Sequence, residues 1–396
     1  MRVLLNCSTL VKGGALQAAV SFIQSAVQQG DREIQWHYVL SQNVAEELQR
    51  FDVMPSLDSI TIMEISPARN KESRRALRIL EQKISPDVVF TFFGPAYVNF
   101  SAPHLCGVAD GWVTHGGYWA WRTIRGAKDA IRSLGLILYK GYMYRKADAW
   151  VTEALIAKRG LIRRLLIPSK KIAVVPNSCG IHYLQSGETR NFPSKDDKVR
   201  ILCMSAYYRH KNLELIPAVA KELESISPEL QFEFVLTLPP ETPGFRKLMA
   251  KATALGVRDR LMNVGQVPVS QGPELYRSCH ILFLPSVLET SSANYPESMA
   301  MGLPIVTVGL EFARTACGLA AVYFEPMNHC AAARAIATLC NSEQTWEQVV
   351  KEGKAILQLL PTSTDRYELY KKCLGELYRT QGSVDYSNVP GLTPRG

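Results

Sequence analysis

The sequence predicts an α/β protein built from two doubly wound domains. Short apolar segments alternate with helix-length segments along the whole chain, and the alternation continues on both sides of a polar stretch at residues 185–198. Strands that alternate with helices form parallel sheets with helices on both faces. The 396 residues, 47% of them hydrophobic, suffice to bury two cores of ordinary size. We therefore expect two such domains facing each other across a cleft, with a ligand at the carboxyl ends of the strands.

The apolar segments predict thirteen strands, seven before the polar stretch and six after it. The predicted strands are 2–6, 34–41, 60–65, 87–93, 104–109, 149–152 and 172–176, then 199–204, 232–238, 262–265, 280–285, 304–308 and 321–324. The clearest helices between them are 15–29, 212–225, 243–255 and 331–340. The expected domains are 1–185 and 186–364. A last helix at 365–380 is expected to pack back on the first domain, and the Gly-, Ser- and Pro-rich residues 381–396 are expected to be disordered.

Cysteine use and the lack of long apolar segments indicate a cytoplasmic protein. The nine cysteines form no C-x-x-C pair and mostly fall inside strand-like or helix-like segments, which is typical of a reducing compartment. The first residues are too poor in apolar side chains for the core of a signal peptide. No segment approaches the run of about 18 apolar residues that a membrane span needs.

The positive charge is concentrated in one region. The formal net charge is +9, and residues 121–171 carry thirteen Lys or Arg against three Asp or Glu, so the rest of the chain nets −1. Aromatic and aliphatic residues are interleaved with these cations, as on a surface that lies on anionic lipid. The alternative is a solvated helix face whose apolar side is core. A nucleic acid is not expected, because no base-reading module accompanies the charge. The candidate membrane or acceptor contacts are Arg122, Arg125, Lys128 and Arg132.

The second predicted domain carries an acidic loop that suits a sugar nucleotide. Glu289 and Glu297, eight positions apart, flank the small residues Thr290, Ser291 and Ser292 just before a short helix. Backbone N–H groups at a helix N-terminus hold anions. Glu297 alone could simply complement the helix dipole, by roughly 0.3 to 1 kcal/mol.

Two cations follow the first strand of the second domain. Arg209 offers a fork of donors and Lys211 a point charge, and a departing diphosphate needs such neutralisation. The alternative, exposed cations at a helix start, is electrostatically poor because that end of the helix is already positive.

Three further candidates lie in the first domain. Gly13 and Gly14 stand between the first strand and a helix, where glycine lets the backbone approach a ligand, although a tight turn explains them as well. Asp110 ends a strand and could bind sugar hydroxyls or accept a proton, or it could cap the turn before Gly111. His115, just beyond, could act similarly or be structural.

Taken together, these motifs resemble the family 4 glycosyltransferases, whose GT-B fold has two Rossmann-like domains. The resemblance rests on the loop at residues 13–14 and on residues 174–177, 209–212, 264–267, 284–286, 289–297 and 321–326. It implies retaining transfer of a sugar from a nucleotide diphosphate donor, without a catalytic metal or other cofactor. It also implies that Glu289 contacts the donor sugar, Glu297 the ribose hydroxyls, and the backbone of Thr290, Ser291 and Ser292 the phosphates. Lys211 and an arginine would neutralise the diphosphate, and Gln266 and Val267 would lie near the base.

The chain departs from the family's pattern in two places. Thr290, Ser291 and Ser292 replace a frequent Gly-Phe-Gly, so hydroxyl groups are expected to supplement the backbone donors. Arg209 stands only two residues before Lys211, where the family has an arginine several residues earlier. Asp110 and His115 are the candidates for a histidine that the family often places near the sugar.

The basic stretch, combined with the resemblance, suggests an acceptor at the cytoplasmic face of the membrane, such as a lipid-linked saccharide or a lipopolysaccharide intermediate. The protein would then be peripheral on the inner face. Two alternatives are a sugar-nucleotide epimerase or phosphorylase of the same fold, and a non-catalytic lipid-binding partner in polysaccharide assembly.

Overall fold

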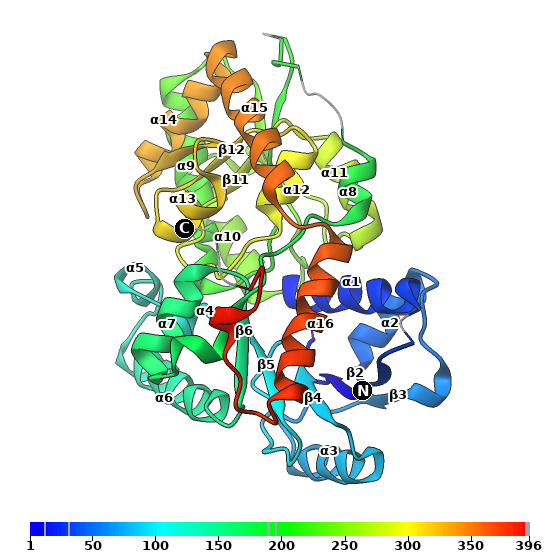
Figure 1. Cartoon of the computed structure of the whole chain (residues 1–396). Helices are drawn as coiled ribbons and strands as arrows, with labels where there is room; N and C mark the ends of the chain where they lie inside the picture. The colour runs from blue at the N-terminus through cyan, green and yellow to red at the C-terminus, as the bar shows by residue number, and fades with distance from the viewer. Residues whose placement is uncertain (12, 31, 188–190, 195, 393–396) are drawn as a thin grey trace. The chain divides into compact units, whose positions relative to one another are not determined.

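The chain forms two compact α/β units in a computed structural model that describes residues 1–11, 13–30, 32–187, 191–194 and 196–392 (Figure 1). The first unit contains Met1–Gly116, Gly126–Ser178 and Pro361–Gly396. The second contains Gly117–Arg125 and Cys179–Leu360. The chain therefore passes between the units at residues 116–126, inside the first predicted domain, as well as near residues 178 and 360.

The first unit is built on a seven-stranded parallel sheet with the order β3-β2-β1-β4-β5-β6-β7. Its strands are β1 (Arg2–Cys7), β2 (Gln35–Ser41), β3 (Ile60–Met63), β4 (Val88–Thr91), β5 (His104–Val108), β6 (Ala149–Thr152) and β7 (Ile172–Val174). The strand order reverses between β1 and β4, which is where doubly wound sheets bind ligands. Every residue of β4, β5 and β6 is buried, as expected for strands covered on both faces.

The second unit repeats this plan with six parallel strands in the order β10-β9-β8-β11-β12-β13. The strands are β8 (Val199–Cys203), β9 (Phe232–Leu236), β10 (Leu261–Asn263), β11 (Ile281–Leu284), β12 (Ile305–Val308) and β13 (Ala321–Phe324). The order reverses between β8 and β11. All thirteen predicted strands overlap the observed ones, so the predicted fold class, two doubly wound α/β domains, is correct.

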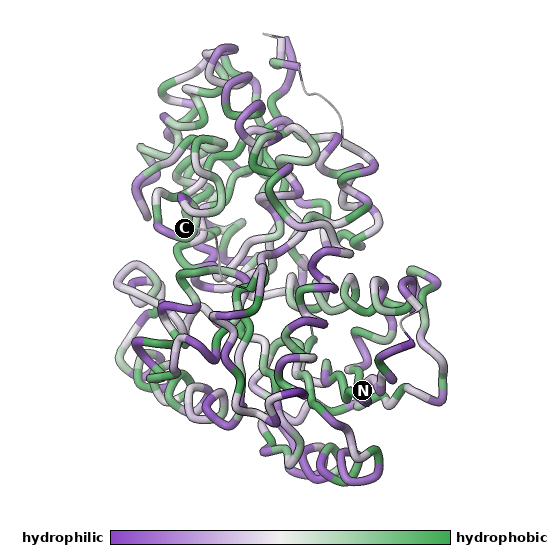
Figure 2. The backbone as a smooth tube through the Cα atoms, viewed as in Figure 1, coloured by the Kyte–Doolittle hydropathy of each residue, from purple (hydrophilic) through white to green (hydrophobic). Residues whose placement is uncertain are grey.

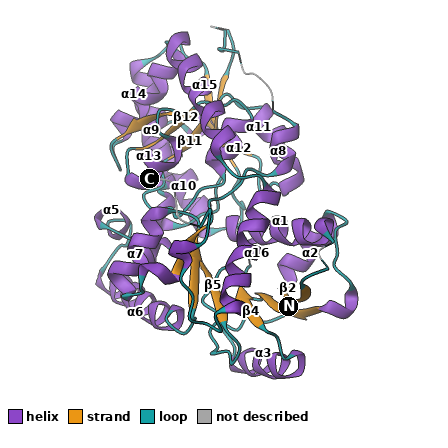
Figure 3. Ribbon diagram, viewed as in Figure 1, coloured by secondary structure: helices purple, strands orange, loops and turns teal. Residues whose placement is uncertain are grey.

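Helices lie against both sheets (Figure 3). Those of the first unit are α1 (Gly14–Gln29), α2 (Gln42–Arg50), α3 (Lys71–Ile84), α4 (Gly111–Thr114), α6 (Ala127–Tyr144), α7 (Leu155–Leu165) and α16 (Ser363–Arg379). Those of the second are α5 (Tyr118–Trp121), α8 (Ile181–Gln185), α9 (Ile216–Ile226), α10 (Pro243–Ala254), α11 (Gly272–Arg277), α12 (Asn294–Ala300), α13 (Glu311–Cys317), α14 (His329–Cys340) and α15 (Glu343–Leu359). Within the described part of the chain, every helix is too short or too polar to cross a bilayer.

The C-terminal helix α16 belongs to the core of the first unit. Its Tyr367 and Tyr370 rings each lie 5.4 Å from the ring of Phe22 on α1. Arg366 donates to Glu153 at 2.8 Å, and both side chains are only 5% exposed. Burial raises the pKa of Glu153, whereas the Arg366 charge lowers it. A buried pair of this kind costs desolvation energy but fixes how α16 sits, because either charge alone would be unpaired.

The disorder predicted after Gln381 is wrong for residues 381–392. Val384, Tyr386 and Leu392 are buried in the core of the first unit. The Val174 backbone N–H donates to the Leu392 carbonyl at 3.2 Å, which ties this segment beside β7. The composition of this segment is rich in Gly, Ser and Pro, so it predicts disorder although the three apolar side chains are buried. Residues 393–396 lie outside the described residues, as do four of those in the polar stretch at 185–198.

Cysteines and surface hydropathy add two observations. None of the nine cysteines forms a disulfide, and seven of them are buried. Figure 2 shows that hydrophilic residues dominate α3, whereas α6 carries hydrophobic and hydrophilic residues together. On α6 only Gly141 and Tyr144 are buried, so most of its apolar side chains reach solvent.

Candidate active site

An ion pair between Lys211 and Glu289 lies beyond the two strands where the order of the second sheet reverses. Lys211 ends the 3₁₀ turn η3 (Arg209–Lys211) that follows β8, and Glu289 follows β11. The Lys211 Nζ lies 2.5 Å from Glu289 Oε1, and the side chains are 19% and 10% exposed. The Val287 N–H donates to the His210 carbonyl at 2.8 Å, so the two loops are also joined through the backbone. The adjacent parallel strands β8 and β11 therefore bring together two residues that are far apart in the sequence.

The Lys211–Glu289 pair can bind an anion and a hydroxyl group at the same time, the anion through the ammonium group and the hydroxyl through the carboxylate. A lysine ammonium group has three N–H donors, and the bond to Glu289 uses one of them. A carboxylate has two oxygens, and Lys211 occupies Oε1. The pair is little exposed, so it acts in a medium of lower effective dielectric than water.

The small-residue loop after Glu289 contains a buried hydroxyl group without a partner. Thr290 is 8% exposed, and among the described residues its Oγ1 makes no hydrogen bond. Ser291 and Ser292 are half-buried. Asn294 donates to the Met204 carbonyl at 2.5 Å, which ties the loop to the end of β8. Because buried polar groups are almost always satisfied, the Thr290 hydroxyl is suited to a ligand oxygen.

Glu297 is buried inside α12. Burial raises its pKa to about 7, although the hydrogen bond that Tyr276 donates to its Oε2 at 3.0 Å lowers it. Burial also raises the pKa of Tyr276 well above its usual value, and the Glu297 charge adds to this effect. A glutamate with a pKa near 7 exists in both protonation states near neutral pH. A ligand that donates hydrogen bonds to the ionised carboxylate therefore shifts the glutamate toward its charged form.

Arg209 shares the η3 turn with Lys211, whereas Gln266 and Val267 lie on another loop of the second unit. Arg209 is exposed at the start of η3, whereas the Lys211 side chain is largely covered. Gln266 is exposed and Val267 half-buried, in the loop that follows β10. In the sheet β10 lies two strands from β8, a distance of about 10 Å at the usual strand spacing.

Gly13 and Gly14 stand at the start of α1 in the first unit. Gly13 has a φ of 79°, and no side chain caps the helix. A Cβ atom built at either glycine meets nothing within 4 Å. The loop is therefore open, and the left-handed φ explains why Gly13 is a glycine.

Asp110 and His115 have structural contacts in the first unit. Asp110 Oδ1 accepts from the N–H groups of Trp112 and Val113 at 3.1 and 3.3 Å, which caps α4. Asp110 Oδ2 lies 2.7 Å from Lys140 Nζ. His115 Nδ1 lies 2.8 Å from Thr114 Oγ1. The capping role that the sequence left open for Asp110 is thus observed, and the catalytic roles of both residues stay predictions.

The four predicted membrane contacts do not belong to one unit. Arg122 and Arg125 fall in Gly117–Arg125, which groups with the second unit, whereas Lys128 and Arg132 lie on α6 of the first. Gly126, with a φ of 85°, separates them at the start of α6. The four residues are thus divided between the two units, and their role as membrane or acceptor contacts stays a prediction.

Sequence reasoning missed the residues that hold the predicted ones in place. Tyr276 reads as an ordinary apolar residue of α11, and Lys140 as one cation among many. Within the described residues, one group of metal-ligating side chains gathers within 4.8 Å: Glu222, His329 and Cys330. These residues lie on α9 and α14 rather than on the loops of Lys211 and Glu289.

The chain matches one protein-family model and is similar in fold to several solved structures. Residues 186–356 match the family model described as Glycosyl transferases group 1. No curated protein matches the sequence.

Among solved structures, a glycosyltransferase from Rickettsia africae ESF-5 is 16% identical with a TM-score of 0.68, covering 94% of this chain and 98% of its own. Anabaena HepE in complex with UDP and glucose is 13% identical with a TM-score of 0.71, covering 95% and 99%. WaaG, a glycosyltransferase involved in lipopolysaccharide biosynthesis, is 12% identical with a TM-score of 0.68, covering 95% and 100%. At these identities the structures show the fold, which is GT-B-like. The family match over the second unit, together with this fold, identifies the chain as a glycosyltransferase.

Proposed function

We propose that the chain is a retaining glycosyltransferase that moves a sugar from a nucleotide diphosphate sugar to an acceptor hydroxyl group, without a metal. The observation that carries the proposal is the Lys211–Glu289 pair at 2.5 Å beside the unpartnered hydroxyl group of Thr290. A cation, a carboxylate and a free hydroxyl group match a diphosphate attached to a sugar. The HepE structure, which holds UDP and glucose in the same fold, supports this choice of donor.

In the proposed reaction the bond between the anomeric carbon and the diphosphate oxygen breaks, and its electron pair leaves with the diphosphate. Lys211 stabilises the charge that develops there, with Thr290, Ser291 and Ser292 donating to phosphate oxygens. Glu289 accepts hydrogen bonds from the donor sugar and holds it for attack. The acceptor oxygen attacks from the face that the diphosphate leaves, and its proton passes to the departing phosphate oxygen. The anomeric configuration is therefore retained.

Glu297 is proposed to hold the nucleoside. A carboxylate can accept hydrogen bonds from both ribose hydroxyl groups, and these are strong because the acceptor is charged. Gln266 and Val267 are proposed to lie near the base, and Arg209 to add positive charge at the diphosphate. Binding of the ribose favours the ionised form of Glu297.

The acceptor is proposed to be a lipid-linked saccharide or a lipopolysaccharide intermediate at the inner face of the membrane. The support is chemical: α6 exposes Ile131, Leu138 and Tyr142 beside Lys128 and Arg132. WaaG, which shares the fold, acts in lipopolysaccharide biosynthesis.

The donor proposal is tested by thermal shift with UDP-glucose, UDP-N-acetylglucosamine and GDP-mannose. A donor at a hundredfold excess over its Kd stabilises the fold by about 2.7 kcal/mol. We expect one nucleotide sugar to raise the Tm of the wild type and to raise that of Lys211→Ala much less. Lys221→Ala, which removes an exposed lysine on α9, is the matched control. A panel without any shift, or equal shifts in all three proteins, would contradict the proposal.

The stereochemistry needs a separate measurement. Proton NMR of the first-formed product gives the anomeric configuration directly. Retention is expected, and an inverted product would refute the same-face attack. Conversion of the donor without an acceptor-dependent product would favour an epimerase instead.

A further inference from the structure

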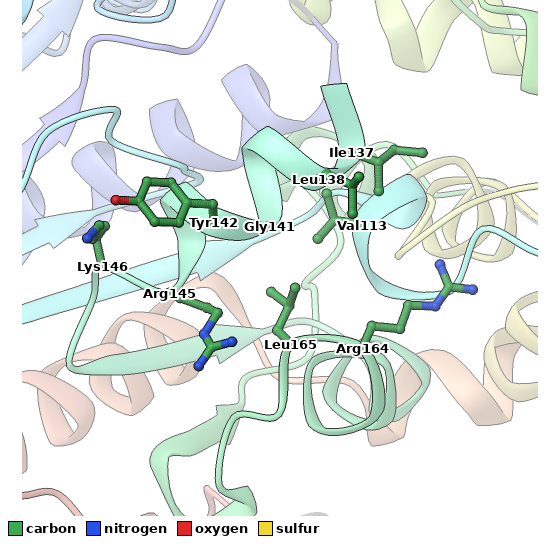
Figure 4. Close-up of a pocket in the computed structure, with 9 residues that line it drawn as sticks. All are labelled: Val113, Ile137, Leu138, Gly141, Tyr142, Arg145, Lys146, Arg164 and Leu165. Atoms are coloured by element: carbon green, nitrogen blue, oxygen red, sulfur yellow. The ribbon is translucent and has the colours of Figure 1, made fainter. Parts of the chain in front are cut away.

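The first unit contains a pocket of about 630 Å³ between α4, α6 and α7. This volume is typical of small-molecule sites, which range from about 300 to 1,000 Å³. Its walls are apolar and include Val113, Ile137, Leu138 and Leu165. Figure 4 shows Leu165 facing Val113, Ile137 and Leu138 across the pocket. Neither the donor site nor the predicted first-domain residues line it.

Three cations surround this apolar pocket. Arg145, Lys146 and Arg164 are among the lining residues, and all three are exposed. Arg164 donates to the carbonyls of Trp112 and Gly116 at 3.3 and 2.8 Å, which fixes the position of its guanidinium group. Lys146 Nζ lies 4.5 Å from the centre of the Tyr142 ring. Among the described residues none of the three pairs with a carboxylate, so their charge is available to an anion.

The pocket continues into an apolar stripe on the surface of α6. Ile131, Leu134, Leu138 and Tyr142 are spaced by three or four residues and so lie on one face of the helix. Ile131 is 71% and Leu138 65% exposed. Leu138 and Tyr142 belong to both the stripe and the pocket wall. A surface that is apolar in the middle and cationic at its margins fits a molecule with an acyl chain and a phosphate group.

We propose that this pocket binds an acyl chain of an anionic phospholipid, with Arg145 and Lys146 beside the phosphate, Arg164 on the opposite side of the pocket and the stripe of α6 in contact with the bilayer (Figure 4). A water-soluble anion does not explain the apolar walls and stripe, and an uncharged lipid does not explain the three cations. The inference deepens the membrane part of the proposed function, but it requires neither a donor nor sugar transfer. It also places the lipid contact at residues other than Arg122 and Arg125.

The test uses the full chain, with vesicles of phosphatidylcholine alone or with a minority of phosphatidylglycerol. The variant is Arg145→Glu/Lys146→Glu. The control, Arg75→Glu/Arg78→Glu, makes the same change in net charge on exposed residues of α3 in the same unit. We expect the wild type to sediment with the anionic vesicles, and more weakly at high salt. The pocket variant should bind about 30-fold more weakly, since each lost cation weakens binding roughly fivefold. The α3 control should bind like the wild type.

The variant Leu138→Ser tests the apolar contribution to lipid binding separately from the contribution of the charges. This side chain is mostly exposed, so the fold should be unaffected, yet vesicle binding should fall severalfold. A short-chain phosphatidylglycerol below its micelle concentration should raise the Tm of the wild type, whereas glycerol phosphate and inorganic phosphate should not.

Four results would overturn the proposal. One is equal loss of binding in the two double variants, which would mean that net charge alone matters. Another is a Tm increase with free phosphate as large as with the lipid. The third is no binding of the wild type to vesicles of either kind. The fourth is a dimer that Leu138→Ser dissociates while vesicle binding is unaffected, which would assign the stripe to a second copy of the chain. The Tm shift induced by the nucleotide sugar, measured on the same preparations, tests the proposed donor site independently of lipid binding.

Discussion

The buried carboxyl group of Glu297 predicts that donor binding strengthens as the pH rises through 7. In the ligand-free protein burial raises its pKa to about 7. The ribose hydroxyl groups donate hydrogen bonds to the ionised carboxylate, so Glu297 must lose its proton before the nucleotide sugar binds. Below the pKa this costs a factor of ten in affinity for each pH unit. With a pKa of 7, the donor should therefore bind about tenfold more weakly at pH 6 than at pH 8.

Isothermal titration calorimetry with a nucleotide sugar is the assay. A nucleotide sugar is preferable to a free nucleoside diphosphate, because a terminal phosphate titrates near pH 6 and would add its own pH dependence. At pH 6 binding should release close to one proton, which is seen as a heat that depends on the ionisation enthalpy of the buffer. Glu297→Gln keeps the shape of the side chain and cannot ionise, so its weaker affinity should not vary between pH 6 and 8. An equally flat profile in the wild type would refute the proposed contact between Glu297 and the ribose.

Three other predictions concern stability. Because the pKa of Glu297 is raised on folding, its contribution to stability is present below pH 4.5 and is lost as the pH rises through 7. The total loss is about 3 kcal/mol, so urea unfolding at pH 5 and 8 should differ more for the wild type than for Glu297→Gln; equal differences would contradict this. Thr290→Val removes a buried hydroxyl group without a partner, so the Tm without ligand should rise while the donor-induced shift shrinks. An unchanged donor shift would show that the hydroxyl group does not meet the donor. Arg366→Met should destabilise the first unit by about 3 to 5 kcal/mol, and Arg366→Met/Glu153→Leu should recover most of it; additive losses in thermal unfolding would contradict the buried pair.

The strands could be predicted because buried parallel strands must be apolar along their whole length. β4 and β11, for example, are four-residue segments in which every residue is buried. The same logic located the loops of Lys211 and Glu289, since the carboxyl ends of neighbouring strands share one edge of a sheet.

The remaining features depend on contacts that sequence spacing does not encode. The raised pKa of Glu297 depends on its burial, and its hydrogen bond from Tyr276 joins residues 21 positions apart. Asp110 could be read as a catalytic group or a cap, and only the geometry shows that it caps α4 and pairs with Lys140. Residues 117–125 group with the second unit although they lie within the first predicted domain, and no local pattern marks this. The pocket between α4, α6 and α7 joins residues up to 52 positions apart, and no local pattern marks it.

The central claim is that Lys211 and Glu289 act together on a nucleotide sugar. The most direct test is the kcat/KM for release of the nucleoside diphosphate from the donor that stabilises the protein. A lipid extract supplies the acceptor, and wild type, Lys211→Ala, Glu289→Ala and Lys221→Ala are compared. Removing one preorganised charge-stabilising group costs about 100- to 1,000-fold in rate. We predict a loss of this size for Lys211→Ala and for Glu289→Ala, and wild-type turnover for Lys221→Ala. Turnover of Lys211→Ala or Glu289→Ala within a few-fold of the wild type would contradict the claim.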